Sequence, residues 1–260
     1  MPKPQSVRVA AIIPARMAAS RFPGKPLLPF HGLPMVEHVR RRALLARVFS
    51  EVVVATCDQE IAEVIEGFDG RVIMTSPDHP AATDRVAEAM RHLDCTHVVN
   101  VQGDEILVLP EDLKRMVETI GGDHSSSAWN AVAPIERIEE LADRSIVKCL
   151  VSATNRVLVC SRDFSRLSLR NSFEPVRIIV GILAYERAFL DRYGRMSRTP
   201  LETIEAIDQS RIIEHDAVLQ GVPFKKGYPG VNEPREVPII EEYLGTDPLQ
   251  RDVLAEVLAV

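Results

Sequence analysis

The sequence predicts an α/β protein with a mostly parallel sheet, and three observations lead to that prediction. Apolar runs of strand length alternate with helix-like segments over residues 9–102. These runs are apolar throughout, which is typical of strands that helices cover on both faces. The chain has 260 residues, of which 46% are hydrophobic and 26% charged, so it is long enough for one large domain with a substantial core.

The elements of the first half follow from hydrophobic periodicity. Strands are expected at 9–14, 51–56, 70–75 and 96–102, and helices at 33–48, 58–66 and 86–93. The outer face of the first helix is expected to be basic. The segment that ends at Arg85 is expected to be a loop, and a further helix should start near Pro110.

The second half changes character after Ser125. Short strands at 131–135, 147–151 and 156–162 predict a β-rich subdomain at about 128–198, inserted within a single domain of residues 1–260. A strand at 178–185 and a helix at 186–193 follow. Thr199, Pro200 and Glu202 have the pattern of a helix start, so we expect one helix to about Gln220, with Glu205 and Gln209 on one face. Two apolar helices, at 237–244 and 249–260, should end the chain.

Three cations lie in the loop that should leave the first strand. Arg16, Arg21 and Lys25 follow Pro14 and Ala15. A loop at the carboxyl end of a buried strand lies where open α/β sheets bind ligands, so clustered positive charge there indicates an anion such as a polyphosphate. The loop has neither the Walker A spacing nor the dinucleotide-binding glycine pattern. Solvated loop charges are the alternative.

An acidic pair follows the fourth strand. Gln102 and Gly103 precede Asp104 and Glu105, at the sheet edge where the cationic loop should also lie. Mg²⁺ prefers one or two protein carboxylates together with phosphate oxygens and water, so this pairing suits polyphosphate chemistry. The alternative is that the two acids cap the helix near Pro110.

Composition excludes several classes of protein. A net charge of -6 leaves no basic surface for nucleic acid, and no apolar run approaches the length of a membrane span. Residues 1–7 are too short and polar for a signal peptide, so we expect a cytoplasmic protein without membrane insertion. The four cysteines form no C-x-x-C pair and are expected to be buried thiols.

Several motifs occur together in an order that resembles one family. They are Ile13-Pro14-Ala15-Arg16, Ser20-Arg21-Phe22-Pro23-Gly24-Lys25-Pro26-Leu27, Asp78-His79 with Thr83-Asp84-Arg85, Asn100-Val101-Gln102-Gly103-Asp104-Glu105, Ser161-Arg162, and Pro200-Leu201-Glu202 with Glu205, Gln209 and Arg211. Over most of its length the chain resembles the CMP-KDO synthetases, the 3-deoxy-manno-octulosonate cytidylyltransferases. The resemblance implies a Rossmann-like nucleotidyltransferase fold with a small β-rich dimerisation subdomain, hence a homodimer.

The resemblance also implies a reaction and a set of site residues. CTP would be joined to an acidic sugar, KDO or a KDO-like acid, with release of pyrophosphate, as in lipopolysaccharide biosynthesis. The implied catalytic residues are Arg16, Lys25 and Asp104. The implied nucleotide-binding residues are Pro14, Ala15, Arg16, Arg21, Lys25, Thr83, Arg85 and Gln102; the acceptor-binding residues are Gln102, Arg162, Tyr185, Glu202 and Gln209; and the Mg²⁺ ligands are Asp104 and Asn232.

Departures from the family pattern leave alternatives open. Asn232 stands where the family has its second metal-binding Asp, which removes one negative charge. Ile179 and Leu183 stand where the family has a sugar-contacting His and Tyr. Because a pocket that has lost polar groups changes what it accepts, the acceptor could instead be a non-sugar acid such as a phosphonate. A CTP-binding pseudoenzyme or regulatory subunit is the third alternative.

Overall fold

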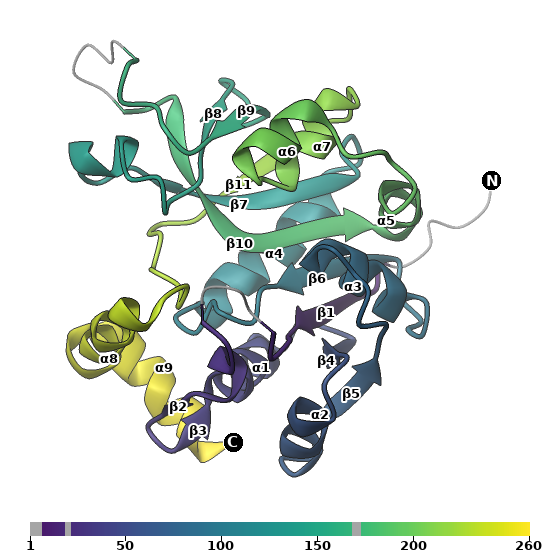
Figure 1. Ribbon diagram of the computed structural model, residues 1–260, viewed down its shortest axis with the longest axis vertical. Coiled ribbons are helices and arrows are strands. Elements are labelled where there is room, and N and C mark those ends of the chain that lie inside the picture. Colours follow the sequence, from purple (N-terminus) through teal and green to yellow (C-terminus); the bar gives the residue numbers. More distant parts are fainter. Residues whose placement is uncertain (1–6, 19–21, 168–172) are drawn as a thin grey trace. The chain divides into compact units, whose positions relative to one another are not determined.

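The computed structural model describes residues 7–18, 22–167 and 173–260 (Figure 1). The chain divides into two compact units. Unit 1 comprises Met1–Glu118 and Tyr228–Val260, and unit 2 comprises Thr119–Gly227. The subdomain expected at about residues 128–198 falls inside unit 2, and its status as an insert stays a prediction.

Unit 1 contains four parallel strands in the order β6, β1, β4, β5. They are β1 (Val9–Pro14), β4 (Glu51–Thr56), β5 (Arg71–Met74) and β6 (His97–Val101). Every residue of β1 is buried, as its uninterrupted apolar sequence predicts. Because β1 and β6 are parallel neighbours, the loops that leave their carboxyl ends emerge at the same edge of the sheet.

Helices pack against this sheet. Unit 1 contains α1 (Met35–Leu45), α2 (Gln59–Glu66), α3 (Ala82–Met90), α8 (Val237–Thr246) and α9 (Pro248–Ala259), the short turns η1 (Lys25–Leu27) and η3 (Pro234–Glu236), and a hairpin of β2 (Pro29–Phe30) and β3 (Leu33–Pro34). α4 (Pro110–Gly122) carries the chain into unit 2. α1 and α3 pack against β1, and α9 packs against α1. Among the described residues, no helix has the length and apolarity needed to cross a membrane.

The expectation that α1 has a basic outer face is wrong, because its arginines are buried. Arg40 and Arg41 both donate to the buried Glu37 carboxylate at 2.6 Å. Arg41 also donates to the carbonyl of Val257 on α9, and Arg42 donates to the carbonyl of Val108. The Glu37 carboxylate, one turn earlier, pairs with both Arg40 and Arg41, and carbonyls accept from Arg41 and Arg42, so the charges in the sequence did not reveal which face packs inward.

The loop expected to continue to Arg85 is shorter than the sequence indicated. α3 begins at Ala82, so Thr83 and Arg85 are helical. The residue before the helix, Ala81, has extended backbone and no side chain that caps the helix. Without a Ser, Thr, Asp or Asn cap, the sequence carries no signal for this helix start.

Unit 2 contains a mixed set of strands. They are β7 (Ala128–Pro134), β8 (Lys148–Val151), β9 (Val157–Ser161), β10 (Val176–Glu186) and β11 (Gln220–Pro223), with η2 (Ile138–Leu141), α5 (Arg187–Tyr193), α6 (Pro200–Glu205) and α7 (Gln209–Glu214). β11 is parallel to β7, whereas β10 is antiparallel to β7 and β8, and β8 is antiparallel to β9. The predicted short strands are therefore confirmed. Cys149 and Cys160 are buried free thiols, as expected, and so is Cys95 in unit 1, but the expectation is wrong for Cys57, which is only partly buried.

The single helix expected from Pro200 to about Gln220 is two helices. Thr199 and Glu202 form the expected capping box, but α6 ends at Glu205 and α7 starts at Gln209. Ala206, between them, has a left-handed backbone with φ of 53°. The expectation that Glu205 and Gln209 share one helix face is therefore wrong, and no glycine or proline marked the break.

Candidate active site

The loop after β1 is closed on itself. Gly24 has φ of 79°, which favours glycine, and its N–H donates to the carbonyl of Met17 at 3.0 Å. The Met17 N–H in turn donates to the carboxylate of Asp58, at the start of α2, at 2.8 Å. Arg16 lies exposed on this loop, and Arg21 lies outside the described residues. These bonds tie Gly24 to Met17 and Met17 to the start of α2, near the carboxyl end of β1.

Two glycines allow three segments to meet beside this loop. A Cβ on Gly103 would lie 2.9 Å from the carbonyl oxygen of Pro14, and a Cβ on Gly230 would lie 3.1 Å from the carbonyl oxygen of Asp104. The same Asp104 oxygen accepts a hydrogen bond from the Val231 N–H at 3.2 Å. The end of β1, the end of β6 and the segment after Tyr228 are thereby held in contact.

An ion pair lies at this junction. The Lys25 ammonium donates to the Asp104 carboxylate at 2.6 Å and to the Val231 carbonyl at 2.8 Å. The side chains of Lys25 and Asp104 are 15% and 17% exposed, so both reach solvent. The predicted meeting of the cationic loop with the acidic pair is therefore present in unit 1.

A cavity of about 210 Å³ opens over the ion pair. It is lined by seven of the residues expected in the site, Pro14, Ala15, Arg16, Lys25, Gln102, Asp104 and Asn232, and also by Phe22, Pro26, Met35, Ala82 and Gly103. Cations, a carboxylate and two amides thus share one cavity with apolar side chains. This composition suits a ligand with an anionic part and a flat apolar part. We did not predict that Phe22 and Met35 line the site, because hydrophobic side chains carry no signal that separates lining from core.

Thr83 and Arg85, also expected in the site, are buried and are not among the residues that line this cavity. The Arg85 guanidinium donates to the Thr75 hydroxyl and, at 3.4 Å, to the Cys57 sulfur. Arg85 therefore ties α3 to the ends of β4 and β5.

The oxygens of Asp104 and Asn232 could serve as ligands of a metal ion. Both residues line the cavity, and carboxylate and amide oxygens suit a hard cation such as Mg²⁺. Within the described part of the chain, no group of three or more His, Cys, Asp or Glu side chains could hold a metal ion. This donor set fits an ion that takes its remaining ligands from phosphate and water. The carboxylate of Glu233, the residue after Asn232, is paired with the Arg235 guanidinium at 3.0 Å.

Four residues expected to contact the acceptor lie in unit 2. Tyr185 is buried and lies parallel to the Phe189 ring, with centroids 6.3 Å apart. Gln209 is buried and donates to the Asn130 side chain at 2.9 Å. The Arg162 guanidinium donates to backbone carbonyls, the shortest contact being 2.8 Å to Glu205.

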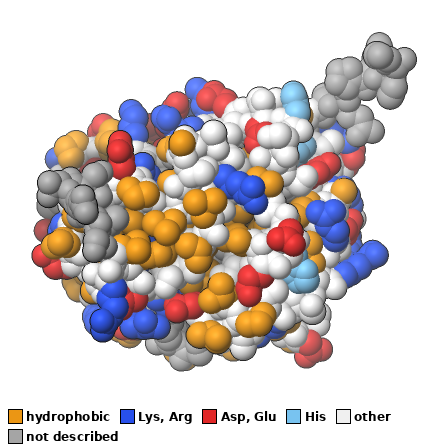
Figure 2. All heavy atoms as spheres, turned by 90° about the horizontal axis from the view of Figure 1, so that it is seen from above, with side chains coloured by type: hydrophobic (Ala, Val, Ile, Leu, Met, Phe, Trp, Pro, Cys, Tyr) orange, Lys and Arg blue, Asp and Glu red, His pale blue; other side chains and the backbone are white. Residues whose placement is uncertain are grey.

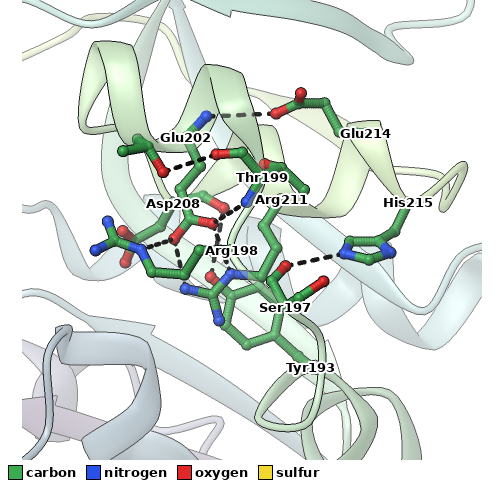
Figure 3. Close-up of polar contacts among 10 residues, drawn as sticks. Tyr193, Ser197, Arg198, Thr199, Glu202, Asp208, Arg211, Glu214 and His215 are labelled. Atoms are coloured by element: carbon green, nitrogen blue, oxygen red, sulfur yellow. Dashed lines mark hydrogen bonds and ion pairs between the residues drawn. The ribbon is translucent and has the colours of Figure 1, made fainter.

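Glu202 is the fourth, and it is enclosed by hydrogen-bond donors (Figure 3). Its carboxylate accepts from the Arg211 guanidinium at 2.9 Å, from Arg198 at 3.1 Å and from the Thr199 N–H at 3.2 Å. Arg211 also lies over the Tyr193 ring at 4.5 Å. Burial by itself raises the pKa of Glu202, but these hydrogen bonds outweigh it and hold the pKa below its ordinary value.

Comparisons with known proteins agree with this geometry. The sequence profile of the cytidylyltransferase family matches residues 10–222. The 3-deoxy-manno-octulosonate cytidylyltransferase of Myxococcus xanthus is 40% identical over 224 residues, which cover 85% of this chain and 88% of that protein. The 8-amino-3,8-dideoxy-manno-octulosonate cytidylyltransferase of Shewanella sediminis is 34% identical over 246 residues, which cover 93% and 100%.

A solved structure gives the same result. The structure of CMP:2-keto-3-deoxy-manno-octonic acid synthetase complexed with CTP has a TM-score of 0.86 and 31% identity to this protein, over 92% of this chain and 99% of that one. The expected nucleotidyltransferase fold is confirmed. The chain therefore belongs to the cytidylyltransferase family, as a relative of the CMP-KDO synthetases.

Proposed function

We propose that this enzyme transfers CMP from CTP to a carboxylated sugar of the KDO type, with release of pyrophosphate. The observation that carries the proposal is the solvent-accessible Lys25–Asp104 pair, which shares a cavity with Arg16, Gln102 and Asn232. Phosphoryl chemistry needs cations against the triphosphate and a carboxylate for a metal ion, and this cavity offers both.

Four residues of the cavity then have a role. Arg16 and Lys25 bind the triphosphate and stabilise the charge that develops as pyrophosphate leaves. Asp104 and Asn232 would hold Mg²⁺, which supplies positive charge beside the phosphate oxygens when bound. A hydroxyl of the acceptor attacks the α-phosphorus in line, so that one P–O bond forms, the bond to pyrophosphate breaks and the hydroxyl loses its proton.

The side chains of Ile179 and Leu183 offer no hydrogen bonds to an acceptor, so these two positions do not select a particular sugar by its hydroxyl groups. The two relatives described above carry names that specify KDO and 8-amino-KDO, at 40% and 34% identity to this chain, so either sugar is a candidate. Contacts of Gln102 and Gln209 with the acceptor are part of the proposal. Direct contacts from Tyr185 and Glu202 stay predictions, since these residues are 1% and 0% exposed within unit 2, whereas Gln209 is 7% exposed.

We also propose that the enzyme is a homodimer. Figure 2 shows hydrophobic side chains gathered on one face, which in unit 2 carries β8, β9 and α6. Leu158 on β9 and Leu201 and Ile204 on α6 are exposed hydrophobic residues of this unit. An apolar surface of this kind suits a second copy of the chain. Sedimentation of the wild type and of Ile204→Glu tests this, since only the variant should be monomeric.

The decisive experiment measures pyrophosphate release with Mg²⁺. Each of the four nucleoside triphosphates is paired with KDO, 8-amino-KDO, other acidic sugars and phosphonates. Release with CTP and a KDO-type sugar supports the proposal. Release with CTP and only a non-sugar acid would redirect it to the second acceptor class, and CTP binding without release under any pairing would favour the pseudoenzyme.

A further inference from the structure

The turn between α6 and α7 is held in a conformation that its sequence does not favour. Ala206 has φ of 53°, a region that residues with a Cβ occupy at a cost of roughly 1 kcal/mol. Its N–H donates to the carbonyl of Glu202 as the α6 cap, so the turn closes that helix. A left-handed alanine persists only where surrounding contacts stabilise it.

Arg162 supplies those contacts. Its Nε donates to the Glu205 carbonyl at 2.8 Å and its Nη2 to the Ala206 carbonyl at 3.3 Å. Its Nη1 donates to the Arg144 carbonyl at 3.0 Å, and its backbone N–H donates to the Glu205 carboxylate at 3.1 Å. Two guanidinium nitrogens and the backbone N–H of Arg162 therefore contact Glu205 or Ala206, and the third guanidinium nitrogen contacts Arg144.

The backbone of Arg162 is itself held by Lys148. The ammonium of the buried Lys148 donates to the Arg162 carbonyl and to the Asp143 carbonyl, both at 2.6 Å. A fixed backbone makes the guanidinium a rigid clamp rather than a mobile surface charge. The clamp joins the end of β9 to the α6–α7 turn.

The turn determines where Gln209 lies, because α7 starts at that residue. The Gln209 amide donates to the Asn130 oxygen at 2.9 Å, and the Asn130 amide donates to the Val180 carbonyl at 2.9 Å. Val180 lies in the irregular part of β10, where the pairing register with β7 shifts. A chain of contacts thus leads from Arg162 through the turn to Gln209 and to the bulge of β10.

We propose that Arg162 is a positioning residue, which orders the Ala206 turn so that Gln209 is held on Asn130, and that it does not itself bind the acceptor carboxylate. The proposal rests on the proposed function, since Gln209 is one of the residues assigned to the acceptor. Each guanidinium nitrogen of Arg162 already donates to a backbone carbonyl, and Nε has no second N–H, so a carboxylate that paired through Nε would have to displace the Glu205 carbonyl.

The test uses four variants. They are Arg162→Gln, Arg162→Lys, Ala206→Gly, and the double variant that carries both Arg162→Gln and Ala206→Gly. Arg144→Gln is the matched control, because Arg144 is 63% exposed and lies 3.9 Å from the same Glu205 carboxylate. Hydrogen exchange of amides 205–211, and the KM values for CTP and the acceptor, are measured in each protein.

Arg162→Gln should speed exchange at 205–211 and raise the acceptor KM about tenfold, with the KM for CTP unchanged. Arg162→Lys should lie between it and wild type. Ala206→Gly should restore part of both losses in the Arg162→Gln protein, because glycine adopts positive φ without strain. Arg144→Gln should match wild type.

Wild-type exchange at 205–211 in Arg162→Gln would overturn the proposal, as would a raised acceptor KM that Ala206→Gly does not relieve, since a direct ligand of the acceptor would behave in that way. If wild type releases no pyrophosphate with any acidic sugar, the proposed function fails instead. The exchange measurements then still decide whether Arg162 orders the turn.

Discussion

Each unit of this protein contains a close ion pair, and the two pairs differ in their access to solvent. In unit 1 the Lys25 and Asp104 side chains are 15% and 17% exposed and line a cavity. In unit 2 the Arg211 and Glu202 side chains are 4% and 0% exposed and are enclosed by further hydrogen bonds. The open pair has room to exchange a partner for a ligand, whereas the hydrogen-bonding groups of the closed pair are occupied by other protein groups.

Glu202→Gln should give the largest effect, because it leaves the buried Arg211 guanidinium without its counter-charge. The free energy of unfolding in urea should fall by about 3–5 kcal/mol. Removing the more exposed partner of the same carboxylate, Arg198, whose side chain is 55% exposed, should cost under about 1 kcal/mol. Equal losses from Glu202→Gln and Arg198→Gln would contradict the view that burial sets the role of this pair.

Asp104→Asn should do the opposite and affect activity rather than stability. The rate of pyrophosphate release should fall about 100- to 1000-fold, the size expected on loss of one preorganised charge contact. The thermal midpoint should change little, because Lys25 keeps its contact with the Val231 carbonyl and reaches solvent. Asp94→Asn makes the same chemical change at an 81% exposed site and should leave both quantities unaltered. A large drop in thermal midpoint for Asp104→Asn would make this pair structural as well.

His38 gives unit 1 a pH-dependent contribution to the free energy of unfolding, which can be compared with that of Glu202 in unit 2. Its ring donates to the Phe30 carbonyl at 2.7 Å, and burial, aided by Arg42, His31 and Arg41, lowers its pKa from 6.5 to about 4. The unfolded chain therefore binds this proton at higher pH than the folded one. Stability should fall as pH drops from about 6.5 to about 4, by about 3 kcal/mol in total, and then level off.

His38→Gln keeps a donor for Phe30 but cannot titrate, so its stability curve should lack this step. The lowered pKa of Glu202 acts in a different range: its stabilisation is present above the ordinary carboxyl pKa and is lost as pH falls through the lower folded value. Urea unfolding at a series of pH values separates the two. An unchanged slope between pH 6.5 and 4 in His38→Gln would assign the step to other groups.

Asn232→Asp should have the smallest effect and probes the open site. A second carboxylate in the cavity should lower the Mg²⁺ concentration for half-maximal activity, by about tenfold. Asn155→Asp adds the same charge in a turn of unit 2 and should not change it. Higher turnover in Asn232→Asp would favour a degenerate metal site, lower turnover would favour one adapted to Asn, and an unchanged Mg²⁺ requirement would remove Asn232 from the ligands.

Much of the fold could be predicted from local patterns of hydrophobic residues in the sequence. The uninterrupted apolar run at Val9–Pro14 and the valine-rich run at His97–Val101 predicted buried parallel strands, because a strand covered by helices on both sides carries apolar side chains on both faces. The central ion pair of the site could be predicted for a related reason. Loops at the carboxyl ends of neighbouring parallel strands meet at one edge, so Lys25 and Asp104 could be expected near each other although they are far apart in sequence.

Other features depend on contacts that no local window contains. The burial of Arg40 and Arg41 depends on Glu37 and on α9, which packs against α1. The break at Ala206 depends on Arg162, which is over forty residues away in the chain, so helix periodicity could not reveal it. Glu202 was expected at the acceptor, and its enclosure by Arg211 and Arg198 became apparent only in the folded unit.

The sequence by itself therefore predicted the α/β class, the alternation of strands and helices along the first half, and the charged residues that meet at the cavity of unit 1. Hydrophobic period and loop charge are local properties, and they persist whatever the rest of the chain does. The folded structure alone decided which charges are open and which are closed. Burial depends on what packs against a side chain from distant parts of the sequence. The difference in burial leaves the Asp104 side chain open to solvent and encloses the Glu202 side chain in unit 2.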